Sequence, residues 1–171
     1  MDAMKKILVV AVVLLLGSCQ QNKIGFVDYA NLMDGYQRKK DLEANYQLKA
    51  ETYSRKRDSI SQVFQLEAQG LQTRTKGMSQ EMAQEEFNVL QQRGQLIGQQ
   101  LQQEEQLMQQ MGQRNMDSLI MDVKARIQVY GKENGYDYIL AGGDGGSVLY
   151  GQEAQDITEA LLKLLNEEYK K

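Results

Sequence analysis

One long stretch, residues 31–134, limits the possible folds of this chain more than any other. It contains no proline, it is rich in glutamine, and its apolar residues recur every three or four positions. Such spacing places apolar side chains on one face of a helix, and the absence of proline permits uninterrupted helices. The stretch is too polar for a globular core of its own. We therefore predict two long helices that fold back on each other as a hairpin.

The first helix of this hairpin is expected to run to about Thr75, with Asp28 or Asn31 as its cap. Its seam positions step by four and three, as in a coiled coil. Lysines in a seam can lay their stems along a partner helix while their ammonium groups reach water. The seam residues are Leu42, Tyr46, Lys49, Tyr53, Lys56, Ile60 and Val63.

The chain is expected to reverse near residues 76–79. Gly77 can adopt the left-handed conformation that ends a helix, and Ser79 can cap the next one. A turn this short makes the two helices antiparallel. At 1.5 Å per residue the hairpin would be roughly 70 to 80 Å long.

The second helix shows a heptad pattern over four heptads. Its glutamine-rich composition is also typical of low-complexity disorder, but the unbroken heptad favours a helix. The seam again includes a glycine and a charged residue. Its positions are Phe87, Leu90, Gly94, Ile97, Leu101, Glu104, Met108 and Met111.

Residues 1–18 have the three parts of an export signal: two lysines at 5 and 6, an apolar run at 7–16, and the small residues Gly17 and Ser18. The apolar run is shorter than the roughly 20 residues that span a bilayer, which argues against a transmembrane anchor. The only cysteine of the chain, Cys19, follows directly.

The segment from Leu16 to Cys19 resembles the lipobox of bacterial lipoproteins. That resemblance implies that Cys19 is acylated and becomes the first mature residue, so that the chain is attached to a membrane by lipid. The alternative is an ordinary secretory signal with an incidental cysteine. Gln20 stands where an aspartate would suggest inner-membrane retention. The expected location is therefore the periplasm, with the anchor in the inner leaflet of the outer membrane.

Residues 19–30 and 135–171 are predicted to form a small β body. Residues 23–28 alternate polar and apolar side chains, and a hairpin is expected from strands at 136–141 and 147–150 around a glycine-rich turn. Asp156 is expected to cap a last helix. The predicted fold is thus mainly α, with an antiparallel coiled-coil hairpin and a small antiparallel sheet. So small a core with unpaired strand edges predicts oligomerisation through the body.

The composition excludes several function classes. The chain has no histidine, which removes the commonest general base and the commonest zinc ligand. Its net charge of -3 argues against nucleic-acid binding. The glycine run at 142–146 lacks the lysine and the following helix of a phosphate loop. We predict no catalytic site, no metal site and no cofactor.

The mature chain resembles the Skp (OmpH) family of periplasmic chaperones. The similarity lies in KIGFVD at 23–28, the Tyr36 region, the long hairpin, YDYIL at 136–140, VLY at 148–150 and DITEAL at 156–161. It implies a homotrimer joined through the bodies, whose arms surround a cavity and hold unfolded outer-membrane β-barrel proteins without ATP. Family members are usually soluble and have basic arms, whereas this chain has a lipobox and arms that are close to neutral.

A holdase needs many weak apolar contacts, and methionine suits such a surface because it is flexible and polarizable. The alternative for each apolar residue of the arms is that it packs in the seam. A second hypothesis for the whole chain is a lipid-anchored coiled-coil scaffold of the cell envelope. The candidate client-binding residues are Tyr46, Tyr53, Phe64, Met78, Met82, Phe87, Met108 and Met111.

Overall fold

The computed structural model describes residues 22–170 and divides the chain into two compact units. The hairpin unit is Tyr36–Val123, and the β unit combines residues 22–35 with residues 124–170. The division falls inside one helix. The predicted signal peptide at 1–18 and the predicted lipidation site Cys19 lie outside the described residues.

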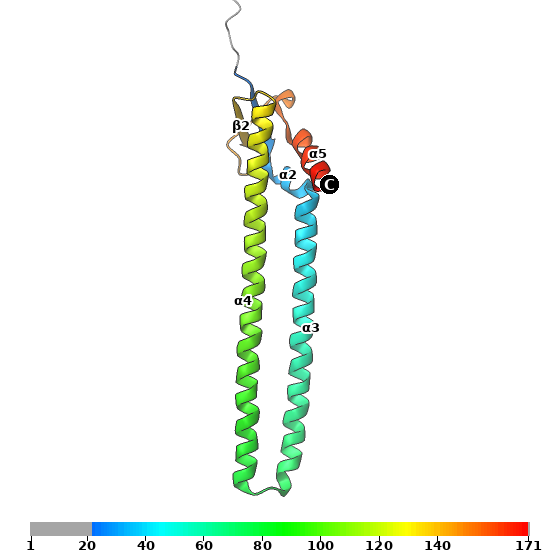
Figure 1. Ribbon diagram of the computed structural model, residues 1–171, viewed down its shortest axis with the longest axis vertical. Helices are drawn as coiled ribbons and strands as arrows, with labels where there is room; N and C mark the ends of the chain where they lie inside the picture. The colour runs from blue at the N-terminus through cyan, green and yellow to red at the C-terminus, as the bar shows by residue number, and fades with distance from the viewer. Residues whose placement is uncertain (1–21, 171) are drawn as a thin grey trace, which may run out of the picture. The chain divides into compact units, whose positions relative to one another are not determined.

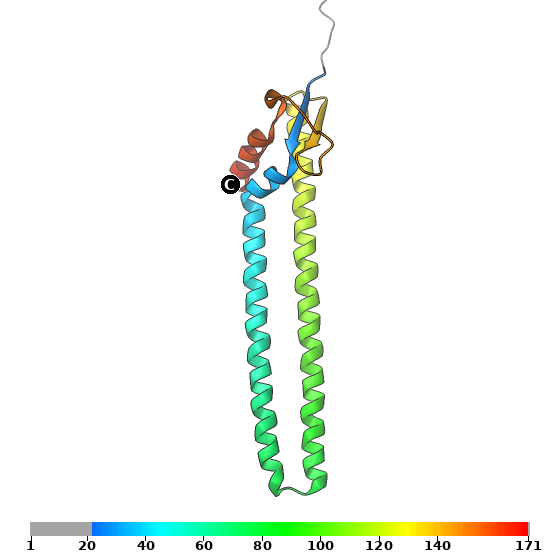
Figure 2. The same cartoon turned by 180° about the vertical axis from the view of Figure 1, so that it is seen from behind.

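The hairpin unit consists of two helices that run side by side in opposite directions (Figures 1 and 2). Helix α3 spans Gln37–Arg74 and helix α4 spans Gln80–Glu133. The 3-10 turn η1, Thr75–Gly77, joins them. Ser79 caps α4 as predicted, because its Oγ accepts a hydrogen bond 3.3 Å long from the backbone N–H of Met82.

The turn reverses the chain differently from the prediction. Gly77 is not in the left-handed region, where only Gly135, Gly143 and Gly145 are found among the described residues. The chain leaves α3 through the 3-10 turn instead, in which the backbone N–H of Met78 donates to the carbonyl of Thr75. Met78 then takes an extended conformation that leads the chain into α4.

The sheet of the β unit is parallel and two-stranded, so the predicted antiparallel sheet is wrong. Strand β1, Ile24–Asp28, pairs with strand β2, Tyr138–Gly142, in a register that sets Phe26 opposite Leu140. Parallel neighbours need a long connection between them. Here both long helices lie between the two strands in sequence, so the chain can return in the same direction.

The expected second strand at 147–150 is not formed. Residues 143–146 make a tight turn with positive φ at Gly143 and Gly145, and Val148 makes one isolated bridge to Gly142. The side chains that follow point away from the unit: Leu149 is 99% exposed and Tyr150 is 87% exposed. The single bridge between Val148 and Gly142 is parallel, so the chain after the turn does not run back along β2 as the second strand of a hairpin.

Two short helices complete the β unit (Figure 2). Helix α2 spans Tyr29–Gly35. The residue before it, Asp28, caps the helix, because its Oδ1 accepts a hydrogen bond from the backbone N–H of Asn31. Helix α5, Thr158–Tyr169, follows the 3-10 turn η2, Glu153–Gln155, and Asp156 accepts from the N–H of Thr158. The core residues of these helices are fully buried: Leu32, Leu161 and Leu165.

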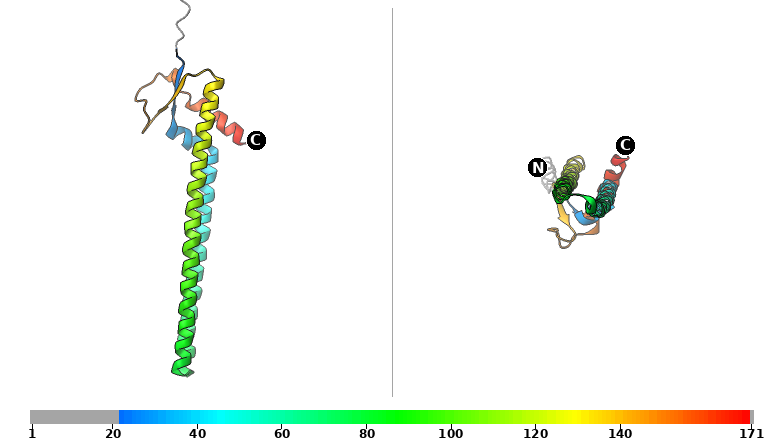
Figure 3. Two further views of the ribbon diagram at one scale, coloured as in Figure 1. Left: turned by 60° about the vertical axis from the view of Figure 1, so that its left-hand side comes forward. Right: turned by 90° about the horizontal axis from the view of Figure 1, so that it is seen from below.

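Three further features bear on function. The predicted single first helix is divided, because Tyr36 is extended between α2 and α3. None of the helices described in residues 22–170 is both long and apolar enough to cross a membrane. The hairpin unit can be followed along its length in Figure 3, whose right-hand view looks up from the turn.

Candidate functional site

Two contacts between an aromatic ring and a glycine set the register of α3 against α4. A Cβ added to Gly94 would lie 3.1 Å from Cε1 of Phe64, and a Cβ added to Gly112 would lie 2.7 Å from Cε2 of Tyr46. The two rings are eighteen residues apart on α3, and so are the two glycines on α4. Eighteen residues make five turns of an undistorted helix, so both contacts lie on the same side of each helix.

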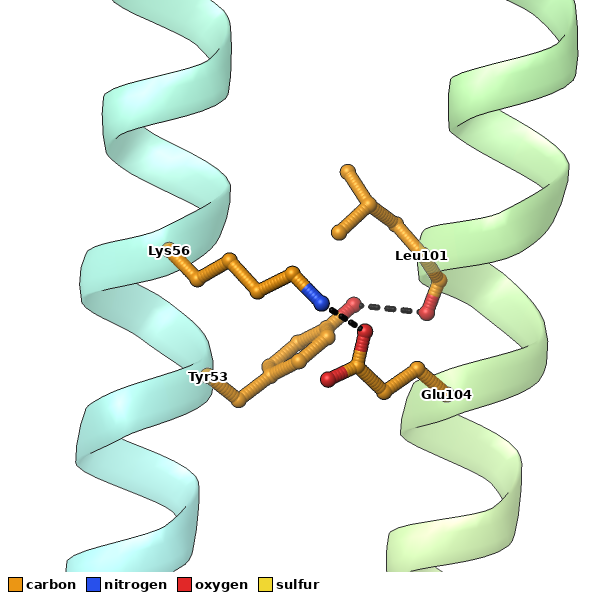
Figure 4. A network of polar contacts seen from close by, with 4 residues as sticks. All are labelled: Tyr53, Lys56, Leu101 and Glu104. Atoms are coloured by element: carbon orange, nitrogen blue, oxygen red, sulfur yellow. Dashed lines mark hydrogen bonds and ion pairs between the residues drawn. The ribbon is translucent and has the colours of Figure 1, made fainter.

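A polar layer lies midway between these two contacts (Figure 4). The hydroxyl of the buried Tyr53 donates a 2.9 Å hydrogen bond to the backbone carbonyl of Leu101. Lys56 Nζ lies 2.5 Å from Glu104 Oε2, and both of these side chains are about half exposed. Because water screens an ion pair this exposed, the Lys56–Glu104 pair adds less than about 1 kcal/mol to stability. Its main effect is to favour this register of the two helices.

Two more ion pairs join the helices in the same register. Arg38 Nη1 lies 2.9 Å from Asp122 Oδ2, and Arg93 Nη1 lies 2.6 Å from Glu67 Oε1. Asp122 raises the pKa of Arg38, so this guanidinium stays charged. The residue numbers in all three ion pairs total 160, and those in the two ring–glycine contacts total 158. Residues whose numbers total 158–160 therefore lie at the same height along the hairpin.

The structure corrects the predicted seam at two positions. Val63 and Met111 are both more than half exposed, and the seam continues through Phe64 and Gly112 instead. A strict heptad would bring Val63 and Met111 inward. The rings of Phe64 and Tyr46 need the space that only a glycine leaves, and this favours the neighbouring positions.

A cavity with a volume of about 1320 Å³ lies between α3 and α4 in the hairpin unit. The two backbones are widely separated here, since Cα atoms of α3 and α4 rarely approach within 8 Å. Amide side chains, including Gln100, Gln103 and Gln113, line its edges beside the Lys56–Glu104 pair. Its apolar lining includes four predicted client-binding residues and two residues that the sequence did not single out for this role: Tyr46, Tyr53, Met108, Met111, Leu48 and Leu107.

The other four predicted client-binding residues lie outside this cavity. Phe64 is half-buried against Gly94, beneath the guanidinium of Arg93 at 5.5 Å from the ring centroid. Met78, Met82 and Phe87 lie in or near the turn and are exposed. The structure thus brings together only half of the predicted set, and whether any of these residues binds a client stays a prediction.

A second apolar surface runs along α4 outside the seam. Successive residues are turned by about 100° around a helix axis, so residues spaced by seven, eleven and four keep nearly the same direction. Five large apolar residues have this spacing, and each is more than half exposed. We call them the α4 row: Met82, Val89, Leu96, Leu107 and Met111.

Helix α3 carries a second row of exposed residues. It lies on the same side of the seam as the α4 row. Its members are exposed and mix apolar with small side chains. On a helical wheel they fall within about 60° of one another. We call them the α3 row: Leu48, Thr52, Ser59, Val63, Leu66 and Gly70.

The opposite side of α4 is lined with amides. The direction about 120° from both the seam and the α4 row contains no exposed large apolar residue. It is occupied by Gln84, Asn88, Gln95, Gln99, Gln102, Gln106 and Gln113. The exposed apolar groups of the hairpin unit beyond its seam and its turn are therefore gathered on one face. Reading only the seam missed this pattern, although a helical wheel of the sequence contains it.

The metal-ligating side chains of the described residues are dispersed. No group of three or more His, Cys, Asp or Glu side chains within residues 22–170 is arranged to hold a metal ion. What the hairpin unit presents is an apolar face, an amide face and a cavity, which are features of a surface that binds other macromolecules.

These features define a helical-hairpin binding protein with a small α/β unit. The comparison with family models matches residues 23–165 to the OmpH-like outer membrane protein family, and the chain belongs to this family. Membership in it indicates a chaperone of the periplasm.

A solved structure has the same fold. It is an OmpH-like protein from Caulobacter crescentus CB15, described as a candidate outer membrane chaperone. It has a TM-score of 0.75 and 14% sequence identity, and the alignment covers 86% of this chain and 85% of that one. The comparison with curated protein sequences finds no match.

Proposed function

We propose that this protein is an ATP-independent holdase that keeps unfolded outer-membrane β-barrel proteins from aggregating. The observation that carries the proposal is the one-sided apolar face of the hairpin unit. Large apolar side chains that remain more than half exposed over most of two long helices mark a binding surface in a soluble protein. Family membership supports a chaperone rather than another kind of binding protein.

The apolar face suits a client without a fixed structure. Its large side chains are leucine, valine and methionine spread over many helical turns. Leu48, Leu107 and Met111 of this face also line the cavity between α3 and α4. Each contact contributes little, but a long unfolded chain can make many of them at once. Binding and release then need no nucleotide.

The active form in this proposal is a homotrimer joined through the β unit. The two strands are flanked only by isolated bridges, from Phe26 to Asp156 and from Gly142 to Val148, so their outer edges are paired only in part. Ile24, Tyr138 and Leu140 are exposed on this sheet. Leu149 and Tyr150 add apolar surface that a monomer would leave in water. Sedimentation equilibrium should report a trimer, and a clean monomer would contradict this part of the proposal.

The decisive test of the holdase is suppression of aggregation. A urea-unfolded outer-membrane β-barrel is diluted into buffer with the chain from residue 19 onward carrying Cys19→Ser, which contains every described residue. We expect suppression near one trimer per client. The triple variant Leu96→Gln, Leu107→Gln, Met111→Gln should need about ten times more protein, equivalent to about 1.4 kcal/mol.

A matched control comes from the amide face. The variant Gln99→Ser, Gln102→Ser, Gln106→Ser changes as many exposed residues of the same helix and should suppress aggregation like the unchanged chain. No suppression by the unchanged chain at a molar excess of trimer would sink the holdase. Capture of one folded envelope protein in fixed stoichiometry would then favour a scaffold lipoprotein.

We further propose that Cys19 carries lipid and holds the protein at the inner leaflet of the outer membrane. The support is the sequence from Leu16 to Cys19. Growth with labelled palmitate should label the chain, and Cys19→Ala should abolish both the label and sedimentation with outer membranes. A labelled Cys19→Ala variant would contradict this site.

A further inference from the structure

We propose that, in the absence of client, the hairpins of neighbouring copies cover one another's apolar faces, with the α4 row of one copy against the α3 row of the next. This proposal rests on the trimer of the proposed function. It assigns a partner to the exposed face, namely a second copy of this chain, and it describes how the client-binding surface is protected from water when it is idle.

The first observation is that the two rows match in height and size. Residues at the same height have numbers that total 158–160. In a rotationally symmetric assembly whose axis runs along the hairpins, residues of equal height on adjacent copies meet. Every residue of the α4 row then meets an apolar or small residue. The pairs are Met111 with Leu48, Leu107 with Thr52, Leu96 with Val63, Val89 with Gly70, and Met82 with Gly77 of the turn.

Three of the five pairs set a large side chain against a short one. Large side chains pack into a facing helix where that helix offers short ones, as knobs enter holes. Thr52, Gly70 and Gly77 are such short residues, and a Cβ added to either glycine would meet nothing within 4 Å in a single copy. These positions therefore have room for a side chain from another molecule.

The second observation is charge complementarity between the two helices. Helix α3 carries eight Lys and Arg against five Asp and Glu, a net charge of +3. The part of α4 in the hairpin unit, residues 80–123, carries two Arg against seven Asp and Glu, a net charge of -5. Contact of α3 with α4 of another copy brings together helices of opposite net charge, whereas contact between two α4 helices would bring together helices of like net charge.

Cysteine crosslinking tests this proposal. Starting from the chain with Cys19→Ser, the test variant carries Val63→Cys and Leu96→Cys, one from each row and at equal height. The control variant carries Gln65→Cys and Gln95→Cys, at nearly the same height on the amide side. A disulfide needs Cα atoms closer than about 7 Å. The two helices of one hairpin rarely come that close, so links must form between copies.

We expect the test variant to form covalent dimers and trimers under mild oxidation at a rate independent of protein concentration. The control variant should crosslink at least tenfold more slowly. Adding a urea-unfolded barrel protein should slow the test crosslink, since the client takes the same face.

Equal crosslinking of the two variants would overturn the proposal. So would the absence of crosslinks in a chain that sediments as a trimer and suppresses aggregation, because the apolar face would then be open to client alone. That result leaves the holdase intact. A monomeric chain would overturn both the covering of the face and the assembly on which it rests.

Discussion

The ring of Tyr46 occupies the space in which a side chain at position 112 would stand: a Cβ added to Gly112 would lie 2.7 Å from Cε2 and 2.9 Å from Cδ2 of that ring. Together with Phe64 on Gly94, this contact determines which residues of the two long helices face each other. The glycines are thus required by their neighbours rather than by their backbone conformation, since neither has positive φ.

Gly112→Ala should therefore destabilise the hairpin. Alanine in a helix gains about 0.5–1 kcal/mol over glycine, but the overlap with the Tyr46 ring costs about 1–3 kcal/mol. We expect a net loss of about 1 kcal/mol in the free energy of unfolding. Urea titration followed by far-UV circular dichroism, at one protein concentration, measures it.

Gly98→Ala is the control for this change. Nothing lies within 4 Å of a Cβ at position 98, so this variant should be more stable by about 0.5–1 kcal/mol. In a Tyr46→Leu background, Gly112→Ala should no longer destabilise, because the ring is gone. Equal effects of Gly98→Ala and Gly112→Ala would show that the ring contact does not form.

Much of this fold follows from residue periodicity. Other parts of the fold do not follow from it, for physical reasons that can be named. The absence of proline and the step of three and four predicted both long helices, and Ser79 marked the start of the second. Phe64 lies in the seam in place of the predicted Val63 because its ring packs on a glycine thirty residues away. No local sequence pattern reveals such a contact. Strand direction is similar: the sequence at 147–150 suggests a hairpin, while the pairing of β1 with β2 joins segments more than a hundred residues apart.

The candidate site was predicted only in part for a related reason. The seam was the strongest periodic signal, so Tyr46, Tyr53 and Met108 were found through it. Leu48 and Leu107 lie beside the seam and carry no heptad signal. Their common direction is found only when the residues outside the seam are also placed on a helical wheel.

Tyr29→Phe should stabilise the β unit. The hydroxyl of Tyr29 is buried and finds no hydrogen-bond partner among residues 22–170, and an unsatisfied buried polar group costs about 1–3 kcal/mol. Removing it should raise the free energy of unfolding by about 1 kcal/mol. A thermal melt that shows an unchanged or lower Tm for Tyr29→Phe would mean that the hydroxyl has a partner in solution.

The same residue predicts a pH dependence. Burial raises the pKa of Tyr29 above its ordinary value of 10.0, because the low-dielectric surroundings disfavour the phenolate. The folded state then binds the proton more tightly than the unfolded state. Its contribution to stability is fully present below pH 10 and is lost as the pH rises above that value. Urea midpoints should fall more steeply above pH 10 for the unchanged chain than for Tyr29→Phe, and parallel curves would contradict this.

Tyr53→Phe should loosen the polar layer by a small amount. The variant keeps the ring that fills the seam and removes only the hydrogen bond to the carbonyl of Leu101. That bond is worth about 0.5–1.5 kcal/mol, and the low end is expected because this carbonyl belongs to a helix. The urea midpoint should fall slightly, while Tyr53→Ala, which also removes the ring, should cost about 3 kcal/mol or more. Equal losses would show that the ring contributes nothing to the seam.

The Lys56–Glu104 pair offers a test of whether holdase activity depends on polar residues in the seam and on the cavity beside them. Both side chains line the cavity between the helices and are half-exposed, so Lys56→Met alone should change stability by less than about 1 kcal/mol. Lys56→Leu with Glu104→Leu replaces the pair by two leucines at seam positions. Because these leucines remove apolar area from water, the double variant should stabilise the hairpin by about 1 kcal/mol. It also fills part of the cavity. We therefore expect this double variant to unfold at higher urea yet to suppress aggregation of a β-barrel client less well. If it is more stable and equally active, the cavity takes no part in holding clients, and the apolar rows alone bind them.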